Sequence, residues 1–93
     1  DLSIYETNMN ILYDALTALG FEIVRPGGTF YMFPKALESD SVAFCKKALK
    51  YDLILVPGDS FGAPGYFRIA YCVDTEKVQR SIEAFKRFVS SEY

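Results

Sequence analysis

The chain has 93 residues, a length typical of one domain, and 51% of them are hydrophobic. The net charge of −2, without a dense basic stretch, argues against a nucleic-acid-binding protein, and no apolar run approaches the roughly 20 residues that span a bilayer. The chain has no histidine, and Cys45 and Cys72 lie in separate apolar runs, so we expect no metal site and buried free thiols in a reducing, cytoplasmic compartment.

The first part of the chain predicts one helix and two strands. Apolar residues recur at helical spacing within residues 4–19: Leu12, Ala15, Leu16 and Leu19. Gly20 then favours a helix end. Residues 21–24 indicate a short strand, and the RPGG sequence at 25–28 is typical of a turn. Aromatic and β-branched residues at 29–34 predict a second strand, so we expect a hairpin.

The second part predicts a helix, two strands and a final helix. Residues 41–50 follow good N-cap residues and indicate a helix of about ten residues. The apolar run at 53–56 predicts a strand, the loop at 57–65 contains three glycines, and residues 66–73 alternate as a strand. A final helix after Asp74 carries an apolar stripe: Val78, Ile82, Phe85 and Val89.

The elements follow in the order α-β-β-α-β-β-α. This order predicts an α+β fold, a small sandwich with a mostly antiparallel sheet and helices packed on it. We find no linker or repeat, so we expect one domain over residues 1–93. A domain of this size has much surface for its volume, and its apolar surplus indicates a surface that packs against something larger.

Arg68 is the most informative charged residue because its neighbours have the character of a protein interior. Strand alternation places it on one face with the small residues Ala70 and Cys72, which leaves room for a ligand. A guanidinium binds a carboxylate through two parallel hydrogen bonds, so Arg68 is a candidate anion-binding residue. The alternative is an arginine at a sheet edge, paired with a local acid such as Asp59.

Two further features are candidates for a binding site. Gly58, Gly62 and Gly65 allow sharp turns and a close approach of backbone to ligand. The loop lacks the spacing of the known nucleotide-binding motifs, and an ordinary connection is the alternative. Phe30 is a candidate pocket residue, although such an aromatic is more often core or interface. Without histidine or a close carboxylate pair, the sequence shows no catalytic machinery.

Two segments together resemble the C-terminal part of the class I/II aminotransferases, which are pyridoxal-phosphate enzymes of fold type I. They are LGFEIVRPGGTFYMFPK at residues 19–35 and LILVPGDSFGAPGYFRIAYCV at 53–73. The shared pattern is P-G-G-x-F-Y-x-F-P, a helix, and then V-P-G-x-x-F-G-x-x-G-x-x-R-I. The resemblance covers about residues 11–90, in the order of the family.

The resemblance implies a role for each candidate residue. It implies that Arg68 binds the α-carboxylate of an amino-acid substrate. Phe30 similarly looks like a pocket-lining residue near the substrate side chain. The loop residues Gly58, Phe61 and Gly62 would form one wall of that pocket. The substrates implied are an amino acid and a 2-oxo acid.

The resemblance also implies missing parts. The Schiff-base lysine of the family lies in a large domain upstream, and no lysine of this chain has that setting. We therefore expect the small domain of a transaminase, cut within the interdomain helix and inactive alone. The parent would bind pyridoxal phosphate and form a homodimer. A free-standing amino-acid-binding or regulatory module, a pseudo-enzyme parent, and C–S lyase or related chemistry are the alternatives.

Overall fold

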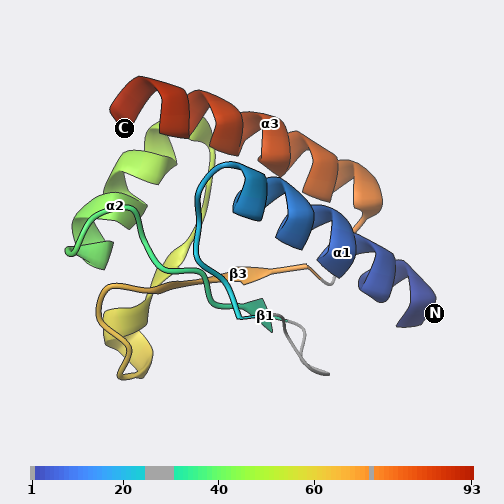
Figure 1. The fold of residues 1–93 in the computed structure, drawn as a ribbon, viewed down its shortest axis with the longest axis horizontal. Coiled ribbons are helices and arrows are strands. Elements are labelled where there is room, and N and C mark those ends of the chain that lie inside the picture. Colours follow the sequence, from blue (N-terminus) through green and yellow to red (C-terminus); the bar gives the residue numbers. More distant parts are fainter. Residues whose placement is uncertain (1, 25–30, 72) are drawn as a thin grey trace.

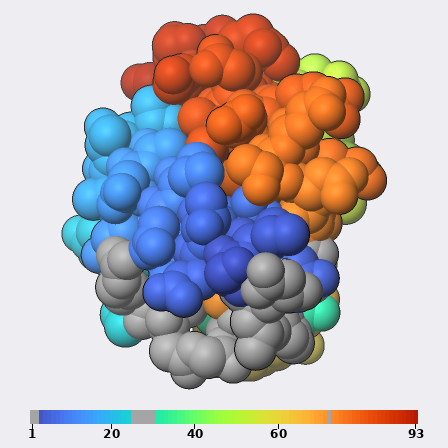
Figure 2. Space-filling model, turned by 90° about the vertical axis from the view of Figure 1, so that its right-hand side faces the viewer, coloured from blue at the N-terminus to red at the C-terminus, as the bar shows by residue number. Residues whose placement is uncertain are grey.

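The computed structural model of the chain describes residues 2–24, 31–71 and 73–93. The elements follow in the order α1 (Leu2–Ala18), β1 (Tyr31–Met32), α2 (Ser41–Ala48), η1 (Leu49–Tyr51), β2 (Val56–Pro57), η2 (Gly58–Phe61), β3 (Phe67–Ala70) and α3 (Thr75–Glu92), where η denotes a 3-10 helix. The long helices α1 and α3 pack side by side along one face of the strands, and α2 lies at one end (Figure 1). Figure 2 shows α1 (blue) directly beside α3 (orange) at the surface.

The three strands form an antiparallel sheet with β3 at its centre, in the order β1-β3-β2. Met32 pairs with Ile69 on one side, and Val56 pairs with Arg68 on the other. An isolated bridge between Lys35 and Tyr66 extends the pairing of the first side. The mixed fold, with helices packed on an antiparallel sheet, confirms the predicted α+β class.

The prediction of a strand at residues 21–24 is wrong, because this segment is irregular in the structure. One backbone hydrogen bond, from the N–H of Lys35 to the carbonyl of Glu22 at 2.9 Å, joins it to the segment after β1. Phe21 is instead directed into the core, where its ring lies edge-on to Phe44 and Phe67. Burial of this ring, rather than a ladder of backbone hydrogen bonds, fixes the segment.

The predicted strand at residues 53–56 is wrong except at its last residue, since β2 contains only Val56 and Pro57. The N–H of Leu53 donates to the carbonyl of Ala48 and so completes the end of the preceding helix. Leu53 and Leu55 are nevertheless buried, whereas Ile54 is 85% exposed, so burial in this structure accounts for only part of the apolar run. The predicted turn at 25–28 lies outside the described residues.

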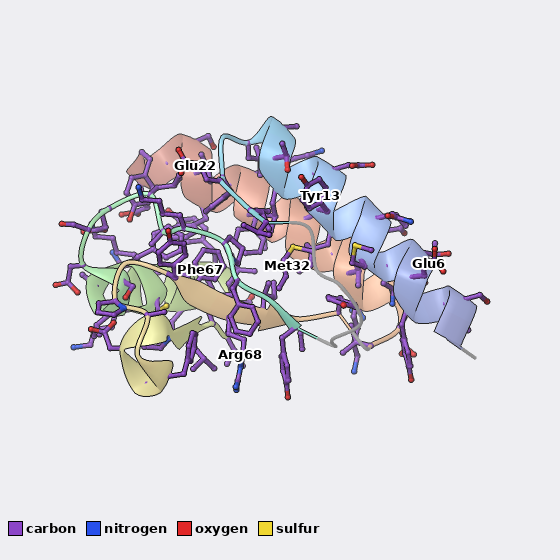
Figure 3. The ribbon with its side chains drawn as sticks, turned by 60° about the horizontal axis from the view of Figure 1, so that its bottom comes forward. Glu6, Tyr13, Glu22, Met32, Phe67 and Arg68 are labelled. Atoms are coloured by element: carbon purple, nitrogen blue, oxygen red, sulfur yellow. The ribbon has the colours of Figure 1, made fainter. Side chains whose placement is uncertain are left out.

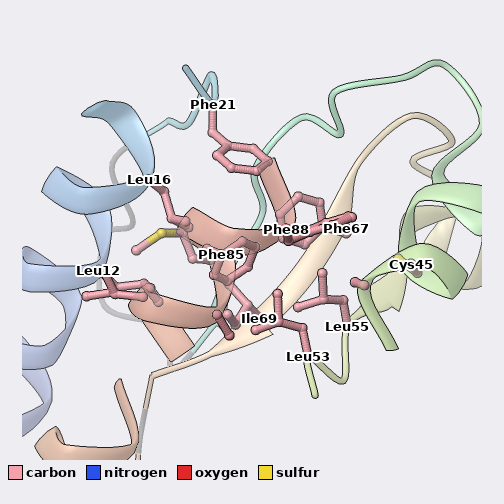
Figure 4. Close-up of a cluster of buried hydrophobic side chains, with 14 of the residues drawn as sticks. Leu12, Leu16, Phe21, Cys45, Leu53, Leu55, Phe67, Ile69, Phe85 and Phe88 are labelled. Carbon is pink, nitrogen blue, oxygen red and sulfur yellow. The ribbon is translucent and has the colours of Figure 1, made fainter. Parts of the chain in front are cut away.

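The core combines aromatic and aliphatic side chains that lie between the sheet and the helices (Figure 4). Phe44 stacks on Phe67, with ring centroids 5.1 Å apart, and packs against Phe88. The predicted stripe of α3 is confirmed at Val78, Ile82 and Phe85, which are all buried. Such ring pairs add roughly 0.5–1.5 kcal/mol each beyond their buried area.

Asn8 is a buried polar residue of α1 that the sequence did not indicate. Its amide nitrogen donates to the carbonyls of Tyr71, at 3.1 Å, and Val73, at 2.6 Å. Its amide oxygen accepts a hydrogen bond from Thr75 at 2.7 Å. Asn8 therefore joins α1 to the segment between β3 and α3.

Candidate functional site

Arg68 lies on β3 and is held by pairing on both sides of that strand. Because β3 is the central strand, Arg68 is not at a sheet edge. The neighbouring residues Phe67 and Ile69 are buried toward the helices, whereas the Arg68 side chain is half-buried and projects away from α1 and α3 (Figure 3). The alternation predicted from the sequence is therefore confirmed, and it places the guanidinium on the open face of the sheet.

Two aromatic rings flank the Arg68 guanidinium. Its central carbon, Cζ, lies over the ring of Tyr31 at 4.4 Å from the ring centroid, and 5.9 Å from the centroid of Phe61. Phe61 is itself held edge-on by Phe33, with ring centroids 5.4 Å apart. These are cation–π distances. The three side chains belong to three different elements: Tyr31 to β1, Arg68 to β3 and Phe61 to η2.

Within residues 2–24, 31–71 and 73–93, the Arg68 guanidinium has no carboxylate within 4.0 Å. Asp59, the local acid considered from the sequence, accepts a hydrogen bond of 2.5 Å from the hydroxyl of Ser41. The pairing of Arg68 with Asp59 is therefore wrong. Among the described residues, Arg68 has ring contacts but no carboxylate partner, so its guanidinium retains N–H donors for an anion.

The glycine-containing loop is a compact turn in which Gly58 and Gly62 meet different constraints. Gly58 is buried, and a Cβ there would lie 1.9 Å from the carbonyl oxygen of Ala63. Gly62 has a φ of +78°, in the left-handed region, at the end of η2. Backbone hydrogen bonds from Gly58 to Tyr66, at 2.6 Å, and from Ala63 to Gly58, at 2.8 Å, close the loop.

Ser41 anchors this loop to α2, and the sequence did not indicate it as a site residue. The buried Ser41 hydroxyl donates to Asp59 and accepts a hydrogen bond of 3.2 Å from the N–H of Gly65. The adjacent Asp40 caps α2 by accepting from the N–H of Ala43. In the sequence, Ser41 is recognisable only as the residue that follows the N-cap Asp40, and this position does not predict its contact with the loop.

The remaining predicted site residues lie in different settings. Phe30 is outside the described residues, so its predicted contact with substrate stays a prediction. Cys72 is likewise outside the described residues. Cys45 is a buried free thiol, as predicted, and its burial, aided by the negative charge of Asp59, raises the thiol pKa to about 11.

A second polar cluster lies away from Arg68. Glu38 accepts hydrogen bonds from the ammonium of Lys47, at 2.8 Å, and from the hydroxyl of Tyr93, at 2.5 Å. These two hydrogen bonds, with that of Lys47 the larger cause, lower the pKa of the Glu38 carboxyl. Burial and the bond to Glu38 raise the pKa of Tyr93. The cluster ties the end of α3 to α2 and serves stability.

The part of the chain that the structure describes contains neither a membrane-spanning helix nor a metal-binding cluster. No helix there is both long enough and apolar enough to cross a membrane. The His, Cys, Asp and Glu side chains of those residues form no group of three that would hold a metal ion.

This chain is similar to known aminotransferases both in sequence and in structure. The sequence model of the family described as aminotransferase class I and II matches residues 2–85. The aspartate aminotransferase of Geobacillus stearothermophilus is 33% identical over 94% of this chain, which covers 24% of that protein. The chain thus spans about a quarter of the length of the relatives that it matches.

Solved structures give the same result. An aminotransferase from Eubacterium rectale matches 97% of this chain with 47% identity and a TM-score of 0.92, and the match covers 23% of that protein. The aspartate aminotransferase from Thermus thermophilus with maleate matches 92% of this chain with 32% identity and a TM-score of 0.88, over 23% of its own length.

Proposed function

Because the chain belongs to the class I and II aminotransferase family, we propose that it is the small, substrate-binding domain of a pyridoxal-phosphate-dependent aminotransferase. The longer enzyme would contain a large cofactor-binding domain as well as residues 1–93. It would move an amino group between an amino acid and a 2-oxo acid, as a homodimer in the cytoplasm. This chain covers only about a quarter of the length of its relatives, which supports assigning the activity to that longer protein.

The observation that carries the proposal is the position of Arg68. Its guanidinium lies on the central strand, on the open face of the sheet, and no described carboxylate neutralises it. We assign it to the α-carboxylate of the substrate. The Thermus thermophilus relative was solved with maleate, a small dicarboxylate, so we expect ligands of this chemical class to bind here as well.

The role of Arg68 is orientation. Two parallel N–H···O bonds fix both the position and the plane of a carboxylate, and they restrict rotation of the attached Cα. Holding a reactant in one orientation lowers the entropic part of the barrier. The loop that contains Gly58, Phe61 and Gly62 would form a wall beside this carboxylate, since Phe61 already contacts the guanidinium.

The lysines of this chain do not fit the attachment of pyridoxal phosphate. Lys47 is ion-paired with Glu38 at 2.8 Å, and Lys35 approaches Glu22 at 4.0 Å. The other four lysines are exposed on or beside helices: Lys46, Lys50, Lys77 and Lys86. The cofactor would supply the electron-withdrawing chemistry, and the large domain would have to hold it.

The test is the substitution Arg68→Lys in the full-length enzyme. Hydrogen bonds to charged groups contribute about 1.5–3 kcal/mol each, and lysine cannot reproduce the fork, so we expect kcat/KM to fall about ten- to a hundredfold. Arg87→Lys, on the exposed side of α3, is the matched control and should leave kcat/KM unchanged. An Arg68→Lys enzyme with the kcat/KM of the parent would refute the role.

The sequence of the gene upstream of residue 1 separates this proposal from its main alternative. Several hundred further codons, including a lysine in a Ser/Thr-rich segment, are expected for the enzyme. A start codon immediately upstream would favour a free-standing amino-acid-binding or regulatory module that uses Arg68 without catalysis.

A further inference from the structure

We propose that Tyr31 and Phe61 are positioning residues for Arg68, and that their rings hold the guanidinium in the orientation that receives a carboxylate. This inference rests on the proposed function of Arg68. Tyr31 makes the closer contact, with 4.4 Å between Cζ of Arg68 and the ring centroid, and Phe61 makes the longer one of 5.9 Å.

The arginine side chain needs such support because it is long and has many rotamers. A guanidinium that samples several positions would lose entropy on binding, and the affinity for a carboxylate would fall accordingly. On the open face of the sheet, Arg68 has no described carboxylate to hold it. The two rings are the described groups that contact its charged end.

Aromatic rings are suited to this task because they restrain the cation without neutralising it. A carboxylate partner would occupy the N–H donors that the substrate needs. A ring attracts the cation through its face and leaves N–H donors available for a planar contact. Arg68 is thus held in place and remains able to form two hydrogen bonds.

The rings are themselves fixed by independent contacts. Tyr31 belongs to β1 and pairs with Ala70 of β3, so its ring is carried by the same sheet as Arg68. Phe61 ends η2, and Phe33 holds its ring edge-on at an interplanar angle of 72°. The guanidinium is therefore placed by the strand pairing and by the glycine-containing loop together.

The chain offers a matched control for Tyr31. Tyr66 lies two residues before Arg68, so strand alternation places it on the same face, away from the buried face of the strand. Tyr31 and Tyr66 are equally exposed, each at 40%. Among the described cation–π contacts of Arg68, Tyr31 takes part and Tyr66 does not. Removing either ring deletes a similar exposed aromatic group.

The experiment measures maleate binding to the full-length holoenzyme by calorimetry, together with its thermal unfolding midpoint. Tyr31→Leu is expected to weaken binding about three- to tenfold, as for a cation–π contact of this kind. Tyr31→Phe, which keeps the ring, should retain the affinity, and Tyr66→Leu should bind as the parent does. Phe61→Leu, the second ring variant, should show a smaller loss because its contact is longer.

A double-mutant cycle identifies the route of the effect. If Tyr31 acts through Arg68, Tyr31→Leu should cause no further loss in an Arg68→Ala background. An equal loss of maleate affinity in the parent and in the Arg68→Ala background would overturn the inference. It would also be overturned if Arg68→Ala binds maleate weakly while Tyr31→Leu and Phe61→Leu both bind as the parent does. Unchanged maleate binding by Arg68→Ala would instead refute the proposed function itself.

Discussion

Gly58 is the position where a single methyl group should do the most damage to the candidate site. A Cβ at residue 58 would lie 1.9 Å from the carbonyl oxygen of Ala63 and 2.8 Å from that of Tyr66. Ordinary contact begins at 3.4 Å, so the shorter distance must grow by about 1.5 Å. Both obstacles are backbone carbonyl oxygens that accept hydrogen bonds within the loop: that of Ala63 accepts from the N–H of Tyr66 at 3.2 Å, and that of Tyr66 accepts from the N–H of Gly58 at 2.6 Å.

The cost of Gly58→Ala follows from these contacts. Weakening two backbone hydrogen bonds costs about 1 kcal/mol each, and overpacking costs typically about 1–3 kcal/mol. We therefore expect the free energy of unfolding, measured by urea denaturation, to fall by about 3–5 kcal/mol. Because the loop carries Phe61, maleate binding should weaken as well.

Gly62→Ala is the control for Gly58→Ala. A Cβ at residue 62 meets no atom within 4 Å, and only the positive φ of +78° opposes it. This strain costs roughly 1–2 kcal/mol. If Gly58→Ala destabilises the protein no more than Gly62→Ala does, the steric argument is refuted.

Two other substitutions test contacts that stabilise the fold. Asn8→Ala should lower the free energy of unfolding by at least about 2 kcal/mol, because it leaves buried hydrogen-bonding groups without a partner; the exposed control Thr7→Ala should change it little, and equal losses would contradict this. Glu38 has a lowered pKa in the folded state because Lys47, and then Tyr93, donate hydrogen bonds to it. The stabilisation from these bonds is present above the unfolded pKa, near 4.5, and is lost as pH falls through the lowered value. Between pH 7 and pH 3 the urea midpoint of the parent should therefore fall more than that of Glu38→Gln, and parallel curves would contradict this.

The elements that sequence periodicity predicted well are those whose burial repeats regularly. Val78, Ile82 and Phe85 follow the turns of α3, and each is buried as its spacing indicated. The alternation around Arg68 was equally informative, because the two faces of β3 differ in burial. In both cases a local pattern determines which side of the element faces the core.

The contacts that could not be predicted join residues far apart in the chain. Asn8 bonds to carbonyls 63 and 65 residues away, and no local pattern indicates that pairing. The contact of Tyr31 with Arg68 depends on the register of β1 against β3. Residues 21–24 predict a strand, but burial of Phe21 among the rings of Phe44, Phe67 and Phe85 determines the path of this segment.

The hydrogen bonds of Asn8 have a mechanical consequence for Arg68. They join α1 to the carbonyl of Tyr71, three residues after Arg68, and to that of Val73. Helix α1 is therefore linked directly to the segment that follows β3, the strand that carries the guanidinium. We therefore expect a tilt of α1 to move the end of β3, and with it the side chain of Arg68.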